Sequence, residues 1–539
     1  MPWLLYFGTL SYPFFFDDLA NIVCNLDIKD LSSISKRLIY PSGFGMGQND
    51  PSRPVTFLTY ALNFSLGGLT PFGYRLVNLL IHSCVSLIIF FLTQRFIQLN
   101  SPLLKGTETQ QSPLLEGMSP QRSPLLEGMI THWSPLLEKE RVRVRIAFLV
   151  AFLFTIHPIH IEVATYISGR ADGIATLFYL LSLLFFLKSE DNRIYAALSL
   201  LTFSLSFWSK PIGVTFPIMV LIFDLLFLPK SDFRKRIWTH ISYWVLLAGF
   251  LIFRVLYLGG LGDRITDPFA QWTRISYLLT QPYCVIKYIQ LLLFPIGQSV
   301  DHFVPPSLGI LDLKTVVGLG CLSALIFLTY LFGKKFPPYS KWIWFSFLWF
   351  FITLSPTSSI FPINDAMTER RLYLPSWGFF LAVALFYQIL FSPSSSPRRK
   401  LGTVPLGTVP NFPSITILLI HLLILSYLSW KRSYLFKDPL TPWKEAVQLY
   451  PQNPRAQYNL GNEYLGLKNF PQAKQHYEAA LHLKATLAEP HNNLGLISLT
   501  EGNFKQAESH FKTALQLNPN LKDARLNLEN LYSQLKLKN

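Results

Sequence analysis

Long apolar runs separated by short polar segments fill the first 430 residues of the chain. A helix needs about 20 mostly apolar residues to cross the hydrocarbon layer of a membrane. The runs predict membrane-spanning helices at 74–96, 146–167, 173–187, 194–208, 213–228, 238–258, 311–332, 341–357, 372–391 and 414–430. The apolar start at 2–16 is short for a crossing, which points to a short first helix or a misassigned start. Together these segments predict about 11 spans.

The last part of the chain, from 443 to 539, is instead polar and amphipathic and repeats with a period of 34 residues. Leu460-Gly461 returns as Leu494-Gly495, and Tyr477 returns as Phe511. Small residues at fixed places let two helices approach, while large residues fill the groove between neighbouring pairs. The spacing and residue types resemble the tetratricopeptide repeat. They predict an α-solenoid with a concave, peptide-binding face; a solubilising cap without a ligand is the alternative.

The composition assigns the apolar part to a membrane rather than to a soluble core. Hydrophobic residues make up 50% of the chain, whereas charged residues make up 14%, against about 25% in soluble proteins. The net charge of +16 comes largely from basic residues in short loops, which is a sign of membrane topology and not of a nucleic-acid partner. The chain therefore divides into a membrane domain at 1–430, a linker at 431–442 and a repeat domain at 443–539.

The basic loops also predict an orientation. They lie at 141–145, 230–236, 334–341 and 398–400, and they share one face only if 275–295 does not cross the membrane. That segment carries Gln281, Pro282 and Lys287, so we interpret it as interfacial or re-entrant. The basic loops are then cytoplasmic, and the repeat domain faces outward. Lys431 and Arg432 lie on the wrong side for this rule.

Two predicted cytoplasmic loops, at 100–140 and 392–413, have low-complexity sequences. An 11-residue unit begins at Ser101, Ser112, Ser123 and Ser134, and a Leu-Gly-Thr-Val-Pro unit occurs twice within 401–410. Such near-identical tandems are typical of recent duplication in a loop that tolerates insertion.

Ionisable residues gather where the predicted spans meet the outer face, including the first outer loop at 17–72. Charge beside a span is costly and often functional. The candidate site residues are Asp17, Asp18, Arg53, His157, His160, Glu162, Arg170, Asp172, Glu369 and Arg370. Several of these residues also have a purely structural interpretation. Asp17 and Asp18 would be solvated helix caps, Arg170 would pair with Asp172, and Glu369-Arg370 would be an interfacial anchor. The spacing of the two histidines does not match a helical zinc pair, so no metal site is assigned.

Several ordered motifs resemble one protein family. They are FDD at 16–18, RPVTFLT at 53–59, GYRLVNLLIH at 73–82, the loop at 157–172 and SPTSSIFPINDAMTERRLYLPS at 355–376. With the appended repeats, they resemble the transmembrane and tetratricopeptide-repeat O-mannosyltransferase-like proteins, within the GT-C glycosyltransferases. The resemblance covers nearly the whole chain outside the two low-complexity loops. It implies an all-α fold: a polytopic GT-C-like membrane bundle followed by the solenoid.

The resemblance also implies an activity. Such an enzyme moves a sugar, mannose in the best-known case, from a polyprenyl-phosphate donor to a hydroxyl of a protein or envelope acceptor on the outer face. Asp17 or Asp18 would be the base of an inverting displacement, and which of the two is left open. Arg170 or Arg370 would stabilise the leaving phosphate, and the remaining candidates would bind donor or substrate. No cofactor is assigned, and the sequence leaves open whether a divalent cation assists.

Two other functions compete with this hypothesis. A non-catalytic membrane scaffold would use the repeats to recruit an envelope partner, but it leaves the outer charged residues without a role. A transporter would carry ionisable residues near the bilayer centre and duplicated halves, and the sequence has neither pattern. Compact loops predict a bacterial inner-membrane protein with its repeats in the periplasm.

Overall fold

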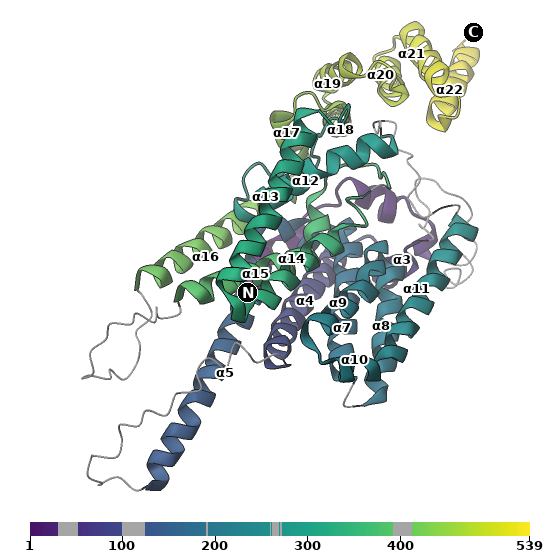
Figure 1. Ribbon diagram of the computed structural model, residues 1–539. Helices are drawn as coiled ribbons and strands as arrows, with labels where there is room; N and C mark the ends of the chain where they lie inside the picture. The colour runs from purple at the N-terminus through teal and green to yellow at the C-terminus, as the bar shows by residue number, and fades with distance from the viewer. Residues whose placement is uncertain are drawn as a thin grey trace.

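The structure is a computed structural model that describes residues 1–30, 52–99, 124–189, 192–258, 272–359, 361–391 and 412–538, with residues 260 and 269. Within these ranges every regular element is a helix. A bundle of long helices forms one end of the molecule, and a stack of short helices at the C-terminus forms the other (Figure 1). The predicted all-α class is confirmed.

The bundle is built by the helices of the first 433 residues. They are α1 (Pro2–Tyr6), α3 (Pro54–Gly67), α4 (Pro71–Leu99), α5 (Pro124–Ile156), α6 (Ile161–Ala164), α7 (Arg170–Lys188), α8 (Arg193–Ser209), α9 (Phe216–Phe227), α10 (Lys230–Lys235), α11 (Ile237–Leu258), α12 (Arg274–Leu293), α13 (Leu313–Lys335), α14 (Ser340–Leu354), α15 (Ser376–Phe391) and α16 (Phe412–Ser433). Helix α4 packs against α5 and α7, and α15 packs against α5 and α14. Small hydroxyl residues allow α7 and α8 to approach closely, because Ser182 and Ser199 hydrogen-bond each other across the contact.

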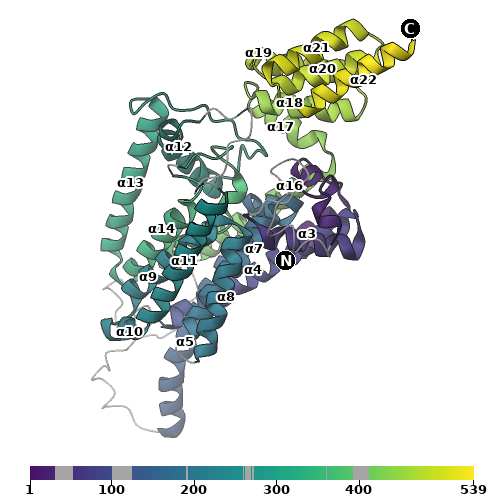
Figure 2. The same cartoon turned by 90° about the vertical axis from the view of Figure 1, so that its right-hand side faces the viewer.

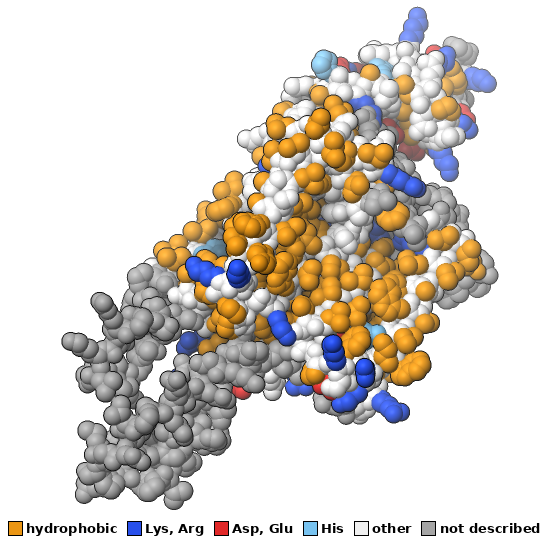
Figure 3. Space-filling view, viewed as in Figure 1, with side chains coloured by type: hydrophobic (Ala, Val, Ile, Leu, Met, Phe, Trp, Pro, Cys, Tyr) orange, Lys and Arg blue, Asp and Glu red, His pale blue; other side chains and the backbone are white. Residues whose placement is uncertain are grey.

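Among the described helices, four are long and apolar enough to cross a membrane: Pro71–Gln98, Ile167–Lys188, Ile237–Tyr257 and Leu313–Lys335. A fifth would be Glu140–Ile156 with Pro158–Ala164, a pair bent by 56°. The bend follows from Pro158, which cannot continue the hydrogen-bonding pattern of the helix. Several other apolar helices are too short, so the figure of about 11 spans stays a prediction. Hydrophobic side chains cover much of the visible face of the bundle (Figure 3).

Helix α12 occupies most of the segment predicted to be interfacial or re-entrant. Pro282 lies inside it, and among the described helices it is not one that is long and apolar enough to cross a membrane. Gly318 of α13 packs directly on it, because a Cβ atom at this glycine would lie 2.6 Å from the backbone nitrogen of Tyr283. The interfacial placement of α12 and the orientation of the bundle stay predictions.

The C-terminal stack contains α17 (Leu440–Leu449), α18 (Pro454–Gly466), α19 (Phe470–Leu483), α20 (Ala488–Thr500), α21 (Phe504–Leu517) and α22 (Lys522–Lys538). These helices pack in sequence as a solenoid, seen side-on in Figure 2. The period of 34 has a simple steric basis: Gly461 lies under the ring of Tyr477, and Gly495 lies under the ring of Phe511. The predicted solenoid is confirmed.

Three boundaries differ from the expected ones. Helix α5 begins at Pro124, inside the predicted insertion at 100–140, and α16 continues to Ser433, inside the predicted linker. Helix α17 then begins at Leu440, three residues before the expected start of the repeats. The repeat units at 101 and 112, residues 31–51 of the first outer loop and the loop at 392–411 lie outside the described residues.

Replacing Gly495 by Val should destabilise the solenoid. A Cβ atom there would lie 2.6 Å from Cε1 of Phe511, which is fully buried and cannot move aside freely. Overpacking of this kind costs about 1–3 kcal/mol. Hydrogen exchange of α20 and α21 in the full chain measures the loss. Gly466→Ala is the control, because nothing lies within 4 Å of its Cβ position; equal protection in both variants would contradict the steric argument.

Candidate functional site

Asp17 and Arg370 meet beneath the solenoid. Asp17 lies in the loop that leaves the first short helices, and Arg370 lies in the 3-10 turn Glu369–Leu372. Oδ2 of Asp17 is 3.7 Å from Nη1 of Arg370, and the two side chains are 36% and 25% exposed. The backbone N–H of Asp17 donates a hydrogen bond to the hydroxyl of Tyr166 at 3.0 Å. The structure therefore brings together, within reach of solvent, one carboxylate and one guanidinium from opposite ends of the membrane domain.

Asp18 has a different environment from its neighbour. It is fully buried, and its carboxylate accepts hydrogen bonds from the N–H of Phe15 at 3.1 Å and from the N–H and hydroxyl of Ser168 at 2.8 and 2.7 Å. Burial raises the pKa of Asp18 to about 6, although Arg75 and these hydrogen bonds oppose the rise. Asp18 thus fastens the loop after the first short helices to the turn before α7 and has no exposed surface for a substrate.

This raised pKa predicts a pH-dependent stability. The pKa of this carboxyl is higher in the folded chain than its ordinary value of 3.8. Its contribution to the free energy of unfolding is therefore largest when it is protonated and falls as pH rises from about 4 to 7. Asp18→Asn removes this titration. Its stability relative to the parent should rise by up to about 3 kcal/mol over that range, as measured by thermal unfolding. Asp232→Asn, at an exposed carboxyl with a lowered pKa, should show no such rise; a flat difference for both variants would contradict the assignment.

Phe16 holds the loop in a strained shape immediately before Asp17. Its φ angle is 47°, in the left-handed region that bulky residues avoid. Such conformations cost about 1–3 kcal/mol and persist only when surrounding contacts impose them. The ring of Phe16 packs edge-on against Trp443 of α17, with 4.9 Å between ring centres. The direction of Asp17 therefore depends on a contact with the solenoid.

Arg170 lies inside the protein. It is 1% exposed, and its guanidinium donates to Asn78 at 2.8 Å, to Asn63 at 2.6 Å and to the carbonyl of Tyr74 at 2.7 Å. The ring of Tyr60 lies 4.8 Å from it. These partners belong to α3 and α4, so Arg170 ties the start of α7 to both helices. The structure does not bring Arg170 to the exposed Asp17–Arg370 pair.

Lys210, which the sequence analysis missed, joins the candidate residues. Its Nζ atom lies 2.5 Å from Oδ1 of Asp172. Burial lowers the pKa of Lys210 to about 8; Asp172 opposes this effect, while Arg53 and Arg370 add to it. Arg53, Lys210 and Arg370 therefore contribute positive charge to one region. A lone lysine before Pro211, between two apolar runs, was the signal that could have identified it.

Two buried glutamates lie near Arg370 and differ in their contacts. Glu369 accepts hydrogen bonds from Gln298 at 2.6 Å, from the N–H of Ser299 at 2.7 Å and from His302 at 2.9 Å. Burial would raise the pKa of Glu369, but His302, Arg432 and Gln298 outweigh it and lower the pKa. Glu162 is 2% exposed, and its Oε1 atom has no hydrogen-bond partner among the described residues. Glu369 thus anchors the 298–302 loop, whereas Glu162 is left with unused acceptor capacity.

His157 and His160 lie at the bend between α5 and α6 and hydrogen-bond to groups around it. His157 accepts a hydrogen bond from the N–H of Ile159 and contacts the carbonyl of Leu292 at 3.1 Å. His160 contacts the carbonyl of Phe154 at 2.6 Å and the hydroxyl of Ser376 at 2.9 Å. Both rings are buried and bonded to protein groups at both nitrogens. In the part of the chain that the structure describes, no three His, Cys, Asp or Glu residues gather as a group that could hold a metal ion.

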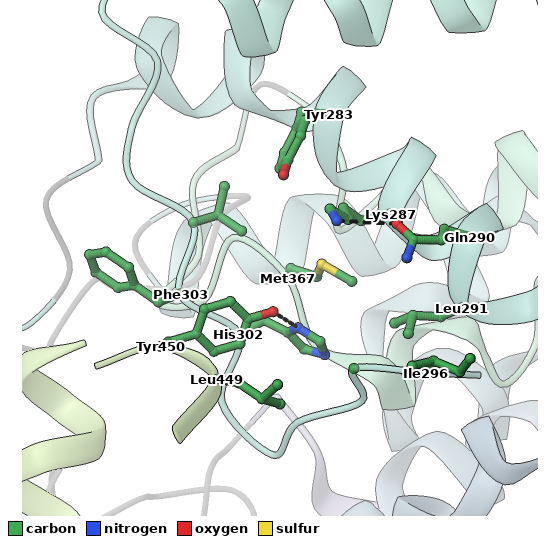
Figure 4. A pocket seen from close by; sticks show the side chains of 12 residues that line it. Tyr283, Lys287, Gln290, Leu291, Ile296, His302, Phe303, Met367, Leu449 and Tyr450 are labelled. Atoms are coloured by element: carbon green, nitrogen blue, oxygen red, sulfur yellow. Dashed lines mark hydrogen bonds between the residues drawn. The ribbon is translucent and has the colours of Figure 1, made fainter. Parts of the chain in front are cut away.

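A cavity of about 180 Å³ lies at the junction of α12, the loop at 296–304 and the end of α17 (Figure 4). The hydroxyl of Tyr450 and Nδ1 of His302 lie 2.9 Å apart at its wall, and Lys287 donates to Gln290 at 3.1 Å. The other lining residues are Tyr283, Leu291, Ile296, Gly297, Phe303, Val304, Met367 and Leu449. His302 is shared between this cavity and Glu369, so the junction borders the candidate site.

Comparison with known proteins supports the resemblance found in the sequence. A protein O-mannosyl-transferase of Caenorhabditis elegans is 29% identical over 85% of this chain and 58% of its own length. Protein O-mannosyl-transferase TMTC1 of Homo sapiens is 24% identical over 92% of this chain and 55% of its own length. Protein O-mannosyl-transferase TMTC3 of Mus musculus is 23% identical over 91% of this chain and 51% of its own length. These homologues confirm the resemblance to the O-mannosyltransferase-like family.

The repeats of this chain also match known families independently of these relatives. Two tetratricopeptide-repeat family models match residues 454–486 and 488–521. The chain spans a little over half the length of the curated relatives it matches. Together with the apolar helices of the chain, these matches indicate a membrane protein with C-terminal tetratricopeptide repeats.

Proposed function

We propose that the chain is a membrane glycosyltransferase of the GT-C type, which moves a mannose-like sugar from a polyprenyl-phosphate donor to a hydroxyl of a protein acceptor. The observation that carries the proposal is the partly exposed Asp17–Arg370 pair, because the proposed reaction needs a base for the acceptor hydroxyl and a cation for the leaving phosphate in one site. The names of the homologous O-mannosyl-transferases support the sugar and the protein acceptor. The site would face the outer side of the membrane. In a bacterial host, that is the periplasmic side of the inner membrane.

In the proposed reaction Asp17 removes the proton of the acceptor hydroxyl while its oxygen attacks the anomeric carbon. The bond from that carbon to the phosphate oxygen breaks, and the lipid phosphate leaves with the electron pair. A hydroxyl is a weak nucleophile, so a positioned base is required. Arg370, with the positive charge of Arg53 and Lys210 nearby, stabilises the negative charge that develops on the leaving phosphate.

The choice of Asp17 over Asp18 as the base rests on access. Asp17 is partly exposed, while Asp18 is fully buried with three hydrogen bonds to its carboxylate. The same argument favours Arg370 over Arg170 as the cation. In this proposal Asp18, His157, His160 and Glu369 are positioning residues, Arg170 stabilises the fold, and Asp172 orients Lys210.

A reconstitution experiment tests the proposal. The full chain is placed in lipid nanodiscs with a polyprenyl-phosphate mannose donor and a peptide rich in Ser and Thr, and transfer of labelled sugar is measured by mass spectrometry. We expect glycosylated peptide and an equal amount of free polyprenyl phosphate. A nucleotide sugar in place of the lipid donor should give no product. A folded, lipid-inserted chain that transfers no sugar from polyprenyl-phosphate donors would favour the scaffold alternative, in which the repeats recruit an envelope partner.

A further inference from the structure

The first solenoid helix contacts the loop that carries Asp17. Trp443 of α17 is 2% exposed, and its ring centre lies 4.9 Å from Phe16 and 5.8 Å from Phe15. Phe436, just before α17, stacks on Tyr166 at 5.6 Å, and Tyr166 is the residue whose hydroxyl accepts the N–H of Asp17. The strained loop is therefore held from the solenoid side by one aromatic cluster.

The second solenoid helix contacts the loop that precedes Arg370 and the 298–302 loop that binds Glu369. Arg455 of α18 donates from Nε to Asp301 at 2.9 Å, and its Nη1 atom lies 2.6 Å from Oδ1 of Asp365. Asn453 adds a hydrogen bond to Asp301 at 3.0 Å. One guanidinium therefore joins two outer loops of the membrane domain to the solenoid, in the two-pronged geometry that suits arginine and not lysine.

A chain of hydrogen bonds extends the second contact toward the candidate site. The hydroxyl of Tyr450 lies 2.9 Å from Nδ1 of His302, and Nε2 of His302 lies 2.9 Å from Glu369 (Figure 4 shows the first link). Glu369 precedes Arg370 in the same turn. Helix α17 thus contacts the loop that carries Asp17, and the segment that leads into α18 is linked through His302 to the turn that carries Arg370.

We propose that the solenoid is a structural part of the transfer site, with Trp443 as a positioning residue for Asp17 and Arg455 as a positioning residue for Arg370. This inference rests on the proposed function and adds to it: besides any acceptor that they bind, the repeats fix the geometry of the reacting groups. Asp17 and Arg370 lie in different loops, so their spacing depends on contacts that hold both loops in place. Helices α17 and α18 make such contacts.

The experiment compares Trp443→Leu and Arg455→Met in the full chain in nanodiscs. Lys474→Met is the matched control, because Lys474 pairs with Glu501 within the solenoid and 2.6 Å separates them. A small displacement of reacting groups lowers rates by up to about 10²-fold. We expect kcat to fall by about tenfold to 10²-fold in both variants, with an unchanged KM for the polyprenyl-phosphate donor and a parental kcat in the control.

Hydrogen exchange gives a second readout that does not depend on activity. Trp443→Leu should increase exchange at residues 14–18, and Arg455→Met should increase it at 298–302 and 365–371, while α20 and α21 keep their protection. If Arg455→Met fails to fold, Tyr450→Phe replaces it, since it removes only the hydroxyl that contacts His302. If Trp443→Leu fails to fold, Trp443→Phe replaces it, since it reduces the ring contact with Phe16. A folded variant with parental kcat, or with unchanged exchange in these loops, overturns the inference. If the parent chain transfers no sugar, the proposed function fails, and the exchange data alone then decide whether the solenoid orders the loops.

Discussion

Asp17→Asn should reduce sugar transfer by about 10²- to 10⁴-fold, the usual loss when a general base is removed. The amide has the same size as the carboxylate, so the loop should keep its shape, but the amide cannot take the proton from the acceptor hydroxyl. The side chain is partly exposed and lies 3.7 Å from Arg370, so little rearrangement of the protein is expected. Initial rates with the polyprenyl-phosphate donor measure the effect, and the KM of the donor should change little.

Asp18→Asn and Asp312→Asn are the comparison variants. Asp312 caps α13 by accepting the N–H of Lys314 at 3.0 Å, away from the candidate site, and its variant should transfer sugar at the parental rate. Asp18→Asn should lower the rate less than Asp17→Asn, since Asp18 acts by holding the loop to Ser168. A parental rate in Asp17→Asn together with a complete loss in Asp18→Asn would assign the base to Asp18 instead.

The fold was predictable where one periodic pattern decides the structure. The 34-residue period led directly to the solenoid, because a glycine under an aromatic ring recurs at Gly461 and Gly495. The number of spans was less predictable. Pro158 and Pro211 divide apolar runs into short helices, and composition alone cannot say whether such pieces join into one crossing.

The candidate site was predictable in its residue types but not in the roles of individual residues. Asp17 and Asp18 are adjacent and chemically identical, and only the approach of Ser168 buries one of them. Arg170 and Arg370 differ in the same way, because Asn63 and Asn78 engage the former. Such distinctions come from contacts between distant segments, which a single sequence does not reveal.

The contact between the solenoid and the membrane domain was missed for a related reason. Arg455 lies in a segment whose pattern identifies it as part of a repeat, and its partners Asp301 and Asp365 lie in irregular loops. No periodicity connects them. Since Trp443 contacts the loop that carries Asp17 and Arg455 contacts the loop that precedes Arg370, substitutions in the repeats and in the membrane domain should interact in double-mutant cycles.

Arg370→Met should lower kcat by about 10²- to 10³-fold, the range seen when one group that stabilises developing charge is removed. The methionine replaces the apolar stem of the side chain but carries no charge, so it cannot stabilise the leaving phosphate. Arg370→Lys should recover part of the loss, because it restores the charge without the planar donor geometry. Rates of sugar transfer at saturating donor, compared with thermal unfolding of the same samples, separate catalysis from stability.

The same substitution at Arg170 is the matched control, and it should give the opposite pattern. Arg170→Met removes the partner of Asn63, Asn78 and the Tyr74 carbonyl inside the protein, so we expect a loss of about 3 kcal/mol or more in stability. The fraction of chain that remains folded should keep most of its activity. If Arg370→Met instead unfolds the chain while folded Arg170→Met loses transfer, the leaving phosphate must be stabilised at Arg170, and the Asp17–Arg370 pair is then a structural contact between two loops.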